Sequence, residues 1–206
     1  MLIATTNAGK VREIRRVLAG LPINVKTLGD LPPFQEPEET GRTFAENALL
    51  KANYYARSSG LATVAEDSGL VIDALGGRPG IESARYPGAT YADKFANLYQ
   101  ELSGHPRPWT ARFVCSLAYV GVPGPKGSAV LFTCEAKVEG EIAPQPRGAN
   151  GFGYDPIFFY PPYGRTLGEA TDEEKLAVSH RGAAFRKFRE WIRRPVAGPA
   201  SSSHPS

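Results

Sequence analysis

LIATTNAGKVREIRRVLA, the stretch that spans residues 2–19, indicates the fold class of the chain. Its first residues, 2–6, are apolar or β-branched and predict a short β-strand. Apolar side chains then recur at Val11, Ile14, Val17 and Leu18, a spacing that predicts a helix over residues 8–19. A strand followed directly by a helix, with the turn Thr-Asn-Ala-Gly between them, is typical of an α/β fold.

The rest of the chain continues this mixture of strands and helices. Capping boxes at Thr43–Glu46 and Thr171–Glu174 predict two helix starts, and Gly60 predicts a helix end. Residues 110–120 and 128–138 alternate like antiparallel partners joined by 121–127, so we expect them to form the backbone of the sheet. The other predicted elements are strands at 23–28, 62–66 and 157–160, helices at 44–58 and 92–102, and a final helix carrying Phe185, Phe188, Trp191 and Ile192 on one face.

Length and composition predict one folded unit. The 206 residues are 42% hydrophobic, which is enough for one sizeable core, and we expect a single domain over residues 1–194. Residues 195–206 are rich in Pro and Ser and are expected to form a disordered tail. Neither a leader segment nor an apolar run of membrane-spanning length is visible, so the expected location is the cytoplasm.

Charge and cysteine content narrow the class of partner. The 24 Lys and Arg against 21 Asp and Glu give a net charge of +3, a small excess that suits a phosphate-bearing small ligand better than nucleic acid. Cys115 and Cys134 lie in apolar runs, where a thiol is most simply a small buried side chain. We therefore expect no disulfide scaffold.

The first candidate site is the turn Thr5-Thr6-Asn7-Ala8-Gly9-Lys10. Backbone amides at a strand-to-helix turn can bind phosphate, and Lys10 adds a positive charge. From spacing alone an ordinary turn capped by Asn7 fits these residues better, because they do not form the Gly-x-x-x-x-Gly-Lys-Ser/Thr phosphate loop.

The second candidate is acidic. Glu38-Glu39 precedes a capped helix and Glu66-Asp67 ends a predicted strand, and their carboxylates could converge on a divalent cation. A solvated acidic loop for the glutamates, and a capping or turn role for Asp67, are the alternatives.

Two further candidates lie late in the chain. In Gly151-Phe152-Gly153-Tyr154-Asp155, glycines permit close backbone approach and an aromatic ring could stack on a base, although a plain turn fits too. Lys175 and Ser179-His180-Arg181 supply hydrogen-bond donors where two helices meet; the alternative is an N-cap at Ser179 followed by surface residues.

The order of these motifs resembles the inosine triphosphate pyrophosphatase family, also called XTP/dITP diphosphatases. The resemblance extends from residue 2 to about residue 194. Its motifs are Thr-Thr-Asn-x-x-Lys at the start, Glu-Thr-Gly-x-Thr-Phe-x-Glu-Asn-Ala-x-x-Lys-Ala at 39–52, Asp-Ser-Gly-Leu at 67–70, Leu-Gly-Gly-x-Pro-Gly-Ile at 75–81, Ser-Ala-Arg-Tyr at 83–86, Gly-Phe-Gly-Tyr-Asp-Pro at 151–156 and Ser-His-Arg at 179–181.

The resemblance implies both a fold and an activity. The implied fold is an elongated α/β structure of two lobes around a long mixed sheet, with the nucleotide between the lobes, and the implied assembly is a homodimer. The implied reaction is hydrolysis of ITP, dITP and XTP to the monophosphate and pyrophosphate with Mg²⁺ as cofactor. No nucleic acid or membrane partner is implied. The Maf-like pyrophosphatases, which have a similar fold and act on modified pyrimidine nucleotides, are one alternative, but their motifs differ. A non-catalytic nucleotide- or RNA-binding protein is another, but it would not need Glu39 and Asp67.

Residue roles follow from the same resemblance. Asp67 looks like the general base and a metal ligand, Glu39 like the second metal ligand, and Lys51 like a phosphate contact. The turn that looks like the triphosphate loop consists of Thr5, Thr6, Asn7, Ala8, Gly9 and Lys10. The positions that match the nucleoside site are Ser68, Phe152, Gly153, Tyr154, Asp155, Lys175, His180 and Arg181. Many relatives have Thr-Gly-Asn at the first turn, and the division of metal ligation among Glu38, Glu39, Glu66 and Asp67 stays open.

Overall fold

The structure of the protein is a computed structural model that describes residues 1–125 and 127–194. The tail expected over residues 195–206 lies outside the described residues. No helix in the described ranges is both long and apolar enough to cross a membrane.

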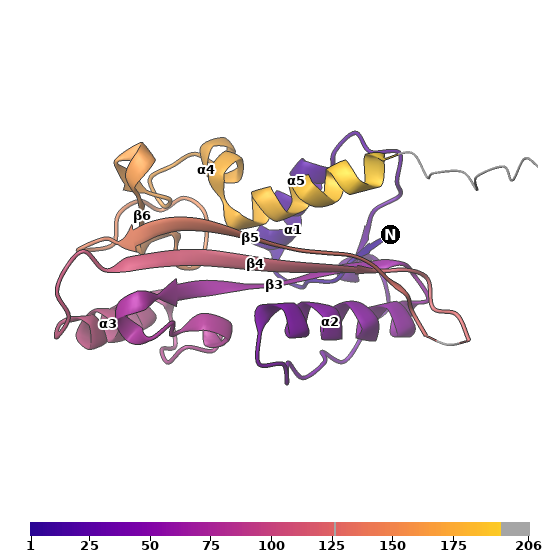
Figure 1. Ribbon diagram of the computed structural model, residues 1–206, viewed down its shortest axis with the longest axis horizontal. Coiled ribbons are helices and arrows are strands. Elements are labelled where there is room, and N and C mark those ends of the chain that lie inside the picture. The colour runs from indigo at the N-terminus through magenta and orange to yellow at the C-terminus, as the bar shows by residue number, and fades with distance from the viewer. Residues whose placement is uncertain (126, 195–206) are drawn as a thin grey trace, which may run out of the picture.

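A mixed sheet is the centre of the molecule (Figure 1). The described residues form seven strands in the order β2–β1–β3–β4–β5–β6–β7. β1 pairs in parallel with β2 and β3, and every other pairing is antiparallel. The strands are β1 (Leu2–Ile3), β2 (Lys26–Thr27), β3 (Thr63–Ile72), β4 (Thr110–Val120), β5 (Val130–Ile142), β6 (Phe158–Tyr160) and β7 (Arg165–Thr166). The α/β class and the long mixed sheet are confirmed.

Helices flank the long strands and divide the core into three parts. The α-helices are α1 (Ala8–Leu18), α2 (Phe44–Ser59), α3 (Tyr91–Leu102), α4 (Asp172–Val178) and α5 (His180–Arg193). Figure 1 shows α1 and α5 on one side of β3, β4 and β5, and α2 on the other. One apolar cluster joins α1 and α5 through side chains such as Ile14 and Phe185, and another joins α2 to the sheet through Ala48 and Ala52. α3 packs into a third cluster with Leu70 and Phe158.

Most helix ends are where the sequence predicts them, because the capping residues act locally. The Asn7 side chain accepts a hydrogen bond from the Lys10 amide and begins α1, and Gly60, with φ +69°, ends α2. Thr43 caps α2 through the Glu46 amide, whereas the Glu46 side chain accepts from the amide of Arg42. Both cysteines are free, as expected.

β3 is the element that differs most from the prediction. We expected a strand over 62–66 followed by turn residues, but β3 continues through Asp67-Ser68-Gly69 to Ile72. Its whole length pairs with β4, from Thr63 opposite Val120 to Ile72 opposite Ala111. A continuous ladder satisfies the backbone groups of this segment and outweighs its turn-forming composition. The polar residues of β3 therefore lie in the middle of the sheet.

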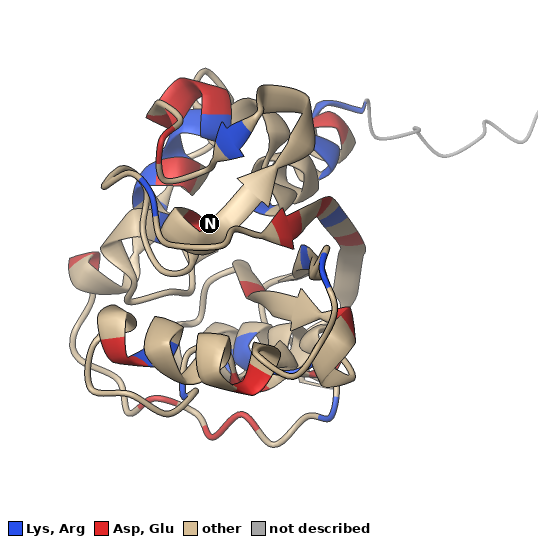
Figure 2. Ribbon diagram, turned by 90° about the vertical axis from the view of Figure 1, so that its left-hand side faces the viewer, with Lys and Arg blue, Asp and Glu red and all other residues tan. Residues whose placement is uncertain are grey.

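Charge is spread over the fold. Figure 2 shows basic and acidic residues interspersed along the ribbon. This distribution agrees with the small net charge of +3.

Candidate active site

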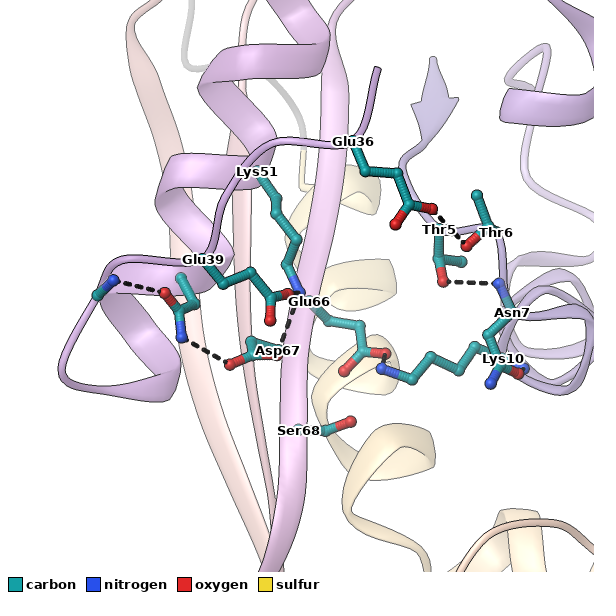
Figure 3. Close-up of polar contacts among 12 residues, drawn as sticks. Thr5, Thr6, Asn7, Lys10, Glu36, Glu39, Lys51, Glu66, Asp67 and Ser68 are labelled. Carbon is teal, nitrogen blue, oxygen red and sulfur yellow. Dashed lines mark hydrogen bonds and ion pairs between the residues drawn. The ribbon is translucent and has the colours of Figure 1, made fainter. Parts of the chain in front are cut away.

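The strand β3 presents alternate side chains to opposite faces of the sheet, and this alternation divides the candidate site. Asp67 faces α2, where it contacts Asn47 and Lys51. Glu66 faces α1 and α5, where it contacts Lys10 and Arg181. Two adjacent carboxylates thus belong to two different charge clusters. Figure 3 shows Asp67 and Glu66 directed to opposite sides of β3.

The cluster on the α2 side joins two carboxylates through one ammonium group (Figure 3). The Lys51 Nζ lies 2.6 Å from Glu39 Oε1 and 3.1 Å from Asp67 Oδ1. Asn47 is fully buried: its Nδ2 donates to Asp67 Oδ2, and its Oδ1 accepts from the Gly41 amide. α2 therefore fixes Asp67 directly and holds the loop that carries Glu39.

The electrostatics of this cluster raise the pKa of Asp67. Burial raises the pKa of Asp67, and the nearby Glu39 and Glu66 raise it further, against the opposing effect of Lys51. Burial also works against the charge on Lys51, but Asp67, Glu66 and Glu39 together raise the pKa of that ammonium group. A carboxylate with a raised pKa is better placed to accept a proton, which is the property a general base needs.

The donor set on this face fits a small hard cation. Glu39 and Asp67 offer carboxylate oxygens to one point, the point that the Lys51 ammonium now neutralises. Mg²⁺ typically takes one or two carboxylates and completes its shell with phosphate oxygens and water. Across residues 1–125 and 127–194 there is no cage of three or more His, Cys, Asp or Glu side chains. Glu38 is exposed, and Glu66 lies on the other face.

On the α1 and α5 side, acids and bases alternate in a buried network. Arg181 donates through Nη1 to Glu13 at 2.7 Å, through Nε to Glu66 at 3.3 Å and through Nη2 to the Ser68 hydroxyl at 2.9 Å. Lys175 lies 2.8 Å from Glu13 and 2.5 Å from Asp155, and Lys10 lies 2.7 Å from Glu66. Each charge has an opposite partner, which is the condition for burying charges in a core.

A cavity opens beside this network. Phe113 stacks on His180 with ring centroids 4.9 Å apart, and His180 is only 5% exposed. Burial, and then the neighbouring charge of Arg181, lowers the pKa of His180 well below its usual range, so the imidazole is neutral. Its Nδ1 has no hydrogen-bond partner among the described residues. The residues lining the cavity include Asn7, Lys10, Ser68, Tyr91, Phe113, Phe152, Gly153, Tyr154, Asp155, Lys175, His180 and Arg181.

The Gly-rich loop forms one wall of this cavity. The Asp155 carboxylate accepts from the Phe152 amide at 2.7 Å and closes the loop. The Tyr154 hydroxyl donates to the Ser83 carbonyl, so it anchors the loop. The Phe152 ring lies over two cations, with Lys175 Nζ 4.1 Å and the Arg181 guanidinium carbon 5.4 Å from its centroid. The loop thus orders an aromatic ring and two positive charges together.

The first turn packs against the cavity and the Gly-rich loop. Asn7 and Lys10 line the cavity, whereas Thr5, Thr6 and Ala8 face a second cavity behind the turn. The Thr6 hydroxyl donates to Glu36, and Thr5 Oγ1 accepts from the Asn7 amide (Figure 3). Gly9 packs so closely on Phe152 that an added Cβ would lie 2.6 Å from the ring. The turn and the Gly-rich loop therefore touch.

Glu13 and Asn47 are among the contributing residues that were not predicted. Glu13 is 9% exposed and pairs with both Lys175 and Arg181. The sequence carried a signal for it, because Glu13 lies on the buried face of the first helix, three residues after Lys10 and four before Val17. Asn47, next to Ala48 on the buried face of α2, is the second. A polar side chain on an apolar face was the detectable sign in both cases.

Comparison with known proteins shows the family to which this chain belongs. The family model described as Ham1 family matches residues 1–191. The chain belongs to the Ham1 family. Its relatives include a dITP/XTP pyrophosphatase of Geobacillus kaustophilus, 48% identical over 96% of both chains. Another, a dITP/XTP pyrophosphatase of Geobacter sulfurreducens, is 46% identical over 93% of this chain and 96% of that protein.

Solved structures of Ham1 family members have the same fold. A HAM1 protein from Coxiella burnetii aligns with a TM-score of 0.83 and 39% identity, covering 93% of this chain and 96% of that one. A nucleoside-triphosphatase, or dITP/XTP pyrophosphatase, from Mycobacterium abscessus aligns with a TM-score of 0.71 and 42% identity, covering 91% of this chain and 97% of that chain. The family resemblance drawn from the motifs is confirmed.

Proposed function

We propose that this Ham1 family member is a nucleoside triphosphate pyrophosphatase that hydrolyses dITP, XTP and ITP to the monophosphate and pyrophosphate. Relatives named dITP/XTP pyrophosphatase, at 46–48% identity over nearly the whole chain, support the reaction class. Within the structure, the observation that carries the proposal is the pair of buried cations, Lys175 and Arg181, on the wall of a cavity that also holds an aromatic ring.

Base selection follows from the hydrogen-bonding chemistry of these cations. Lys and Arg side chains donate hydrogen bonds and cannot accept them. The 6-keto oxygen of hypoxanthine or xanthine can accept from such a donor, whereas adenine presents an amino group there, which is itself a donor. Lys175 pairs with two carboxylates, which leaves one of its three ammonium hydrogens for a ligand. The neutral His180 ring, with its unpaired Nδ1, provides a further polar atom beside the base.

The phosphate chemistry is assigned to the other part of the site. Glu39 and Asp67 would hold Mg²⁺, which supplies positive charge to neutralise the triphosphate. Asp67, whose pKa is raised, accepts a proton from a water molecule. The water oxygen forms a bond to the α-phosphorus as the bond from that phosphorus to the bridging oxygen breaks. Lys10, Lys51 and the amides of Thr6, Ala8 and Gly9 in the first turn stabilise the departing pyrophosphate.

Three broader features complete the proposal. A single domain over residues 1–194 is inferred from length and composition. A homodimeric assembly is inferred from the motif resemblance to the inosine triphosphate pyrophosphatase family, and a cytoplasmic location accords with a free nucleotide as substrate. The interspersed charge in Figure 2 supports a small-molecule substrate in preference to nucleic acid.

The direct test is the choice of substrate. We expect kcat/KM for dITP, XTP and ITP to exceed that for ATP by about a hundredfold or more, and chelation of the metal to abolish pyrophosphate release. Equal rates for ITP and ATP would contradict the proposal. Lys175→Met should narrow the ITP to ATP ratio, because a fixed donor is removed. Lys187→Met is the matched control, since Lys187 lies on α5 and its Nζ donates to the Glu135 carbonyl.

A further inference from the structure

Arg85 lies between the two parts of the candidate site, and none of the roles assigned above includes it. It directly follows Ser83 and Ala84, which line the nucleoside cavity. Its Nη1 donates to Glu39 Oε2 at 3.0 Å, and its Nε donates to Glu82 at 3.3 Å. The segment after β3 thus places a guanidinium group on the outer oxygen of a proposed metal ligand.

Both oxygens of Glu39 are therefore engaged by cations. Lys51 contacts Oε1 and Arg85 contacts Oε2. The two contacts differ in strength: the Lys51 side chain is 13% exposed and is also held by Asp67, whereas the Arg85 side chain is 49% exposed. Exposed ion pairs are weak, so the contact between Arg85 and Glu39 is lost more easily than the contact between Lys51 and Glu39.

We propose that Arg85 is an exchangeable counter-ion. In the nucleotide-free enzyme it neutralises Glu39, and when metal and nucleotide enter it leaves Glu39 and binds the phosphate chain. Charge balance favours this exchange, because the metal replaces the positive charge at Glu39 while the triphosphate brings new negative charge. A guanidinium group is suited to it, since its planar fork of donors matches carboxylate and phosphate oxygens alike. The inference rests on the proposed function, which supplies the phosphate chain and the metal.

The first test measures metal binding without nucleotide, with Mn²⁺ as the probe. Arg85→Ala should tighten Mn²⁺ binding by about two- to fivefold, because a competing cation is lost from Glu39 and an exposed ion pair has a strength of that order. In the Glu39→Gln background the same substitution should have no effect. Unchanged or weaker Mn²⁺ binding in Arg85→Ala would overturn the counter-ion role, because a merely structural residue loosens the site when it is removed.

The second test measures pyrophosphate binding in the presence of metal. Arg85→Ala should weaken the binding of pyrophosphate by about tenfold. The affinity of Arg85→Lys for pyrophosphate should fall between those of Arg85→Ala and wild type, because lysine keeps the positive charge but lacks the planar fork of donors. Arg78→Ala is the matched control: it removes a neighbouring exposed arginine that pairs with Glu101 and not with Glu39. Wild-type affinity in Arg85→Ala would overturn the phosphate role. Neither binding measurement needs turnover. The proposed activity is tested independently, by assaying pyrophosphate release from dITP with the wild-type enzyme.

Discussion

At the scale of single residues, Glu66 and Asp67 show how one peptide step changes the chemistry of a carboxylate. Burial opposes ionisation of Glu66, but Lys10 and Arg181 lower its pKa well below the usual range. Burial raises the pKa of Asp67, with Glu39 adding to the effect. Glu66 is thus a fixed negative charge inside a network, and Asp67 is a carboxylate able to exchange a proton.

Asp67→Asn should separate catalysis from stability. We expect kcat to fall by about a hundredfold or more, because the proton acceptor is lost. A folded-state pKa above the unfolded value means that the ionised Asp67 costs stability, and that this cost appears as pH rises through the folded pKa. Metal-free Asp67→Asn should therefore unfold at the wild-type temperature or above it at neutral pH. Thermal unfolding and steady-state kinetics check the two effects, and a variant that keeps a tenth of wild-type kcat would remove Asp67 from the base role.

At the scale of elements, local signals predicted the helices well and β3 poorly. Capping residues such as Asn7 and Thr171 act on the next turn of the chain, so the sequence reveals them. The length of β3 is decided by pairing with β4, some 50 residues away, and its Asp-Ser-Gly segment gives no local sign of that partner. The same limit applies to the site: the motifs identified the candidate residues, but the separation of Glu66 from Asp67 depends on β3 continuing as a strand through both residues.

The contact between the first turn and the Gly-rich loop gives a prediction for Gly9. A Cβ added there would lie 2.6 Å from the Phe152 ring, so Gly9→Ala should push that ring off Lys175 and Arg181. We expect a rise in KM for dITP of about tenfold with a modest loss of stability, typical of an overpacked contact. Gly104→Ala, with no atom within 4 Å of the added Cβ, is the control. Equal kinetics of both variants would show that the two loops work independently.

At the scale of the whole molecule, the buried network ties together segments that are far apart in sequence. Its acids come from α1, β3 and the Gly-rich loop as Glu13, Glu66 and Asp155. Its bases come from α1, α4 and α5 as Lys10, Lys175 and Arg181. The Arg181 to Glu13 contact spans 168 residues and joins the last helix to the first. Assembly of the cavity lined by Phe152, Lys175 and Arg181 therefore requires most of the chain to be folded.

Glu66→Gln tests how much the fold depends on this network. Removing one partner leaves Lys10 and Arg181 less than fully neutralised, and breaking a buried pair typically costs about 3 kcal/mol or more. Because the folded-state pKa of Glu66 is lowered, its contribution is present above the unfolded pKa and is lost as pH falls through the folded value. Urea unfolding should show a large gap between variant and wild type at pH 7 that narrows under acid. Glu139→Gln is the control, because it removes an exposed ion pair with Arg112. It should change the free energy of unfolding by less than about 1 kcal/mol. A similar loss of stability in Glu66→Gln and Glu139→Gln would contradict the prediction.

The alternation of side chains along β3 also bears on how the gene can change. Deleting or inserting one residue before Glu66 would turn every later side chain of the strand to the opposite face. Glu66 would then point at Lys51, and Asp67 at Lys10 and Arg181, so the proton acceptor and the structural charge would exchange surroundings. A point substitution in β3 changes one side chain, whereas a change in the length of β3 moves many side chains to the wrong face at once. We expect natural length variation in Ham1 family members to fall outside β3, in connections such as residues 121–129 between β4 and β5.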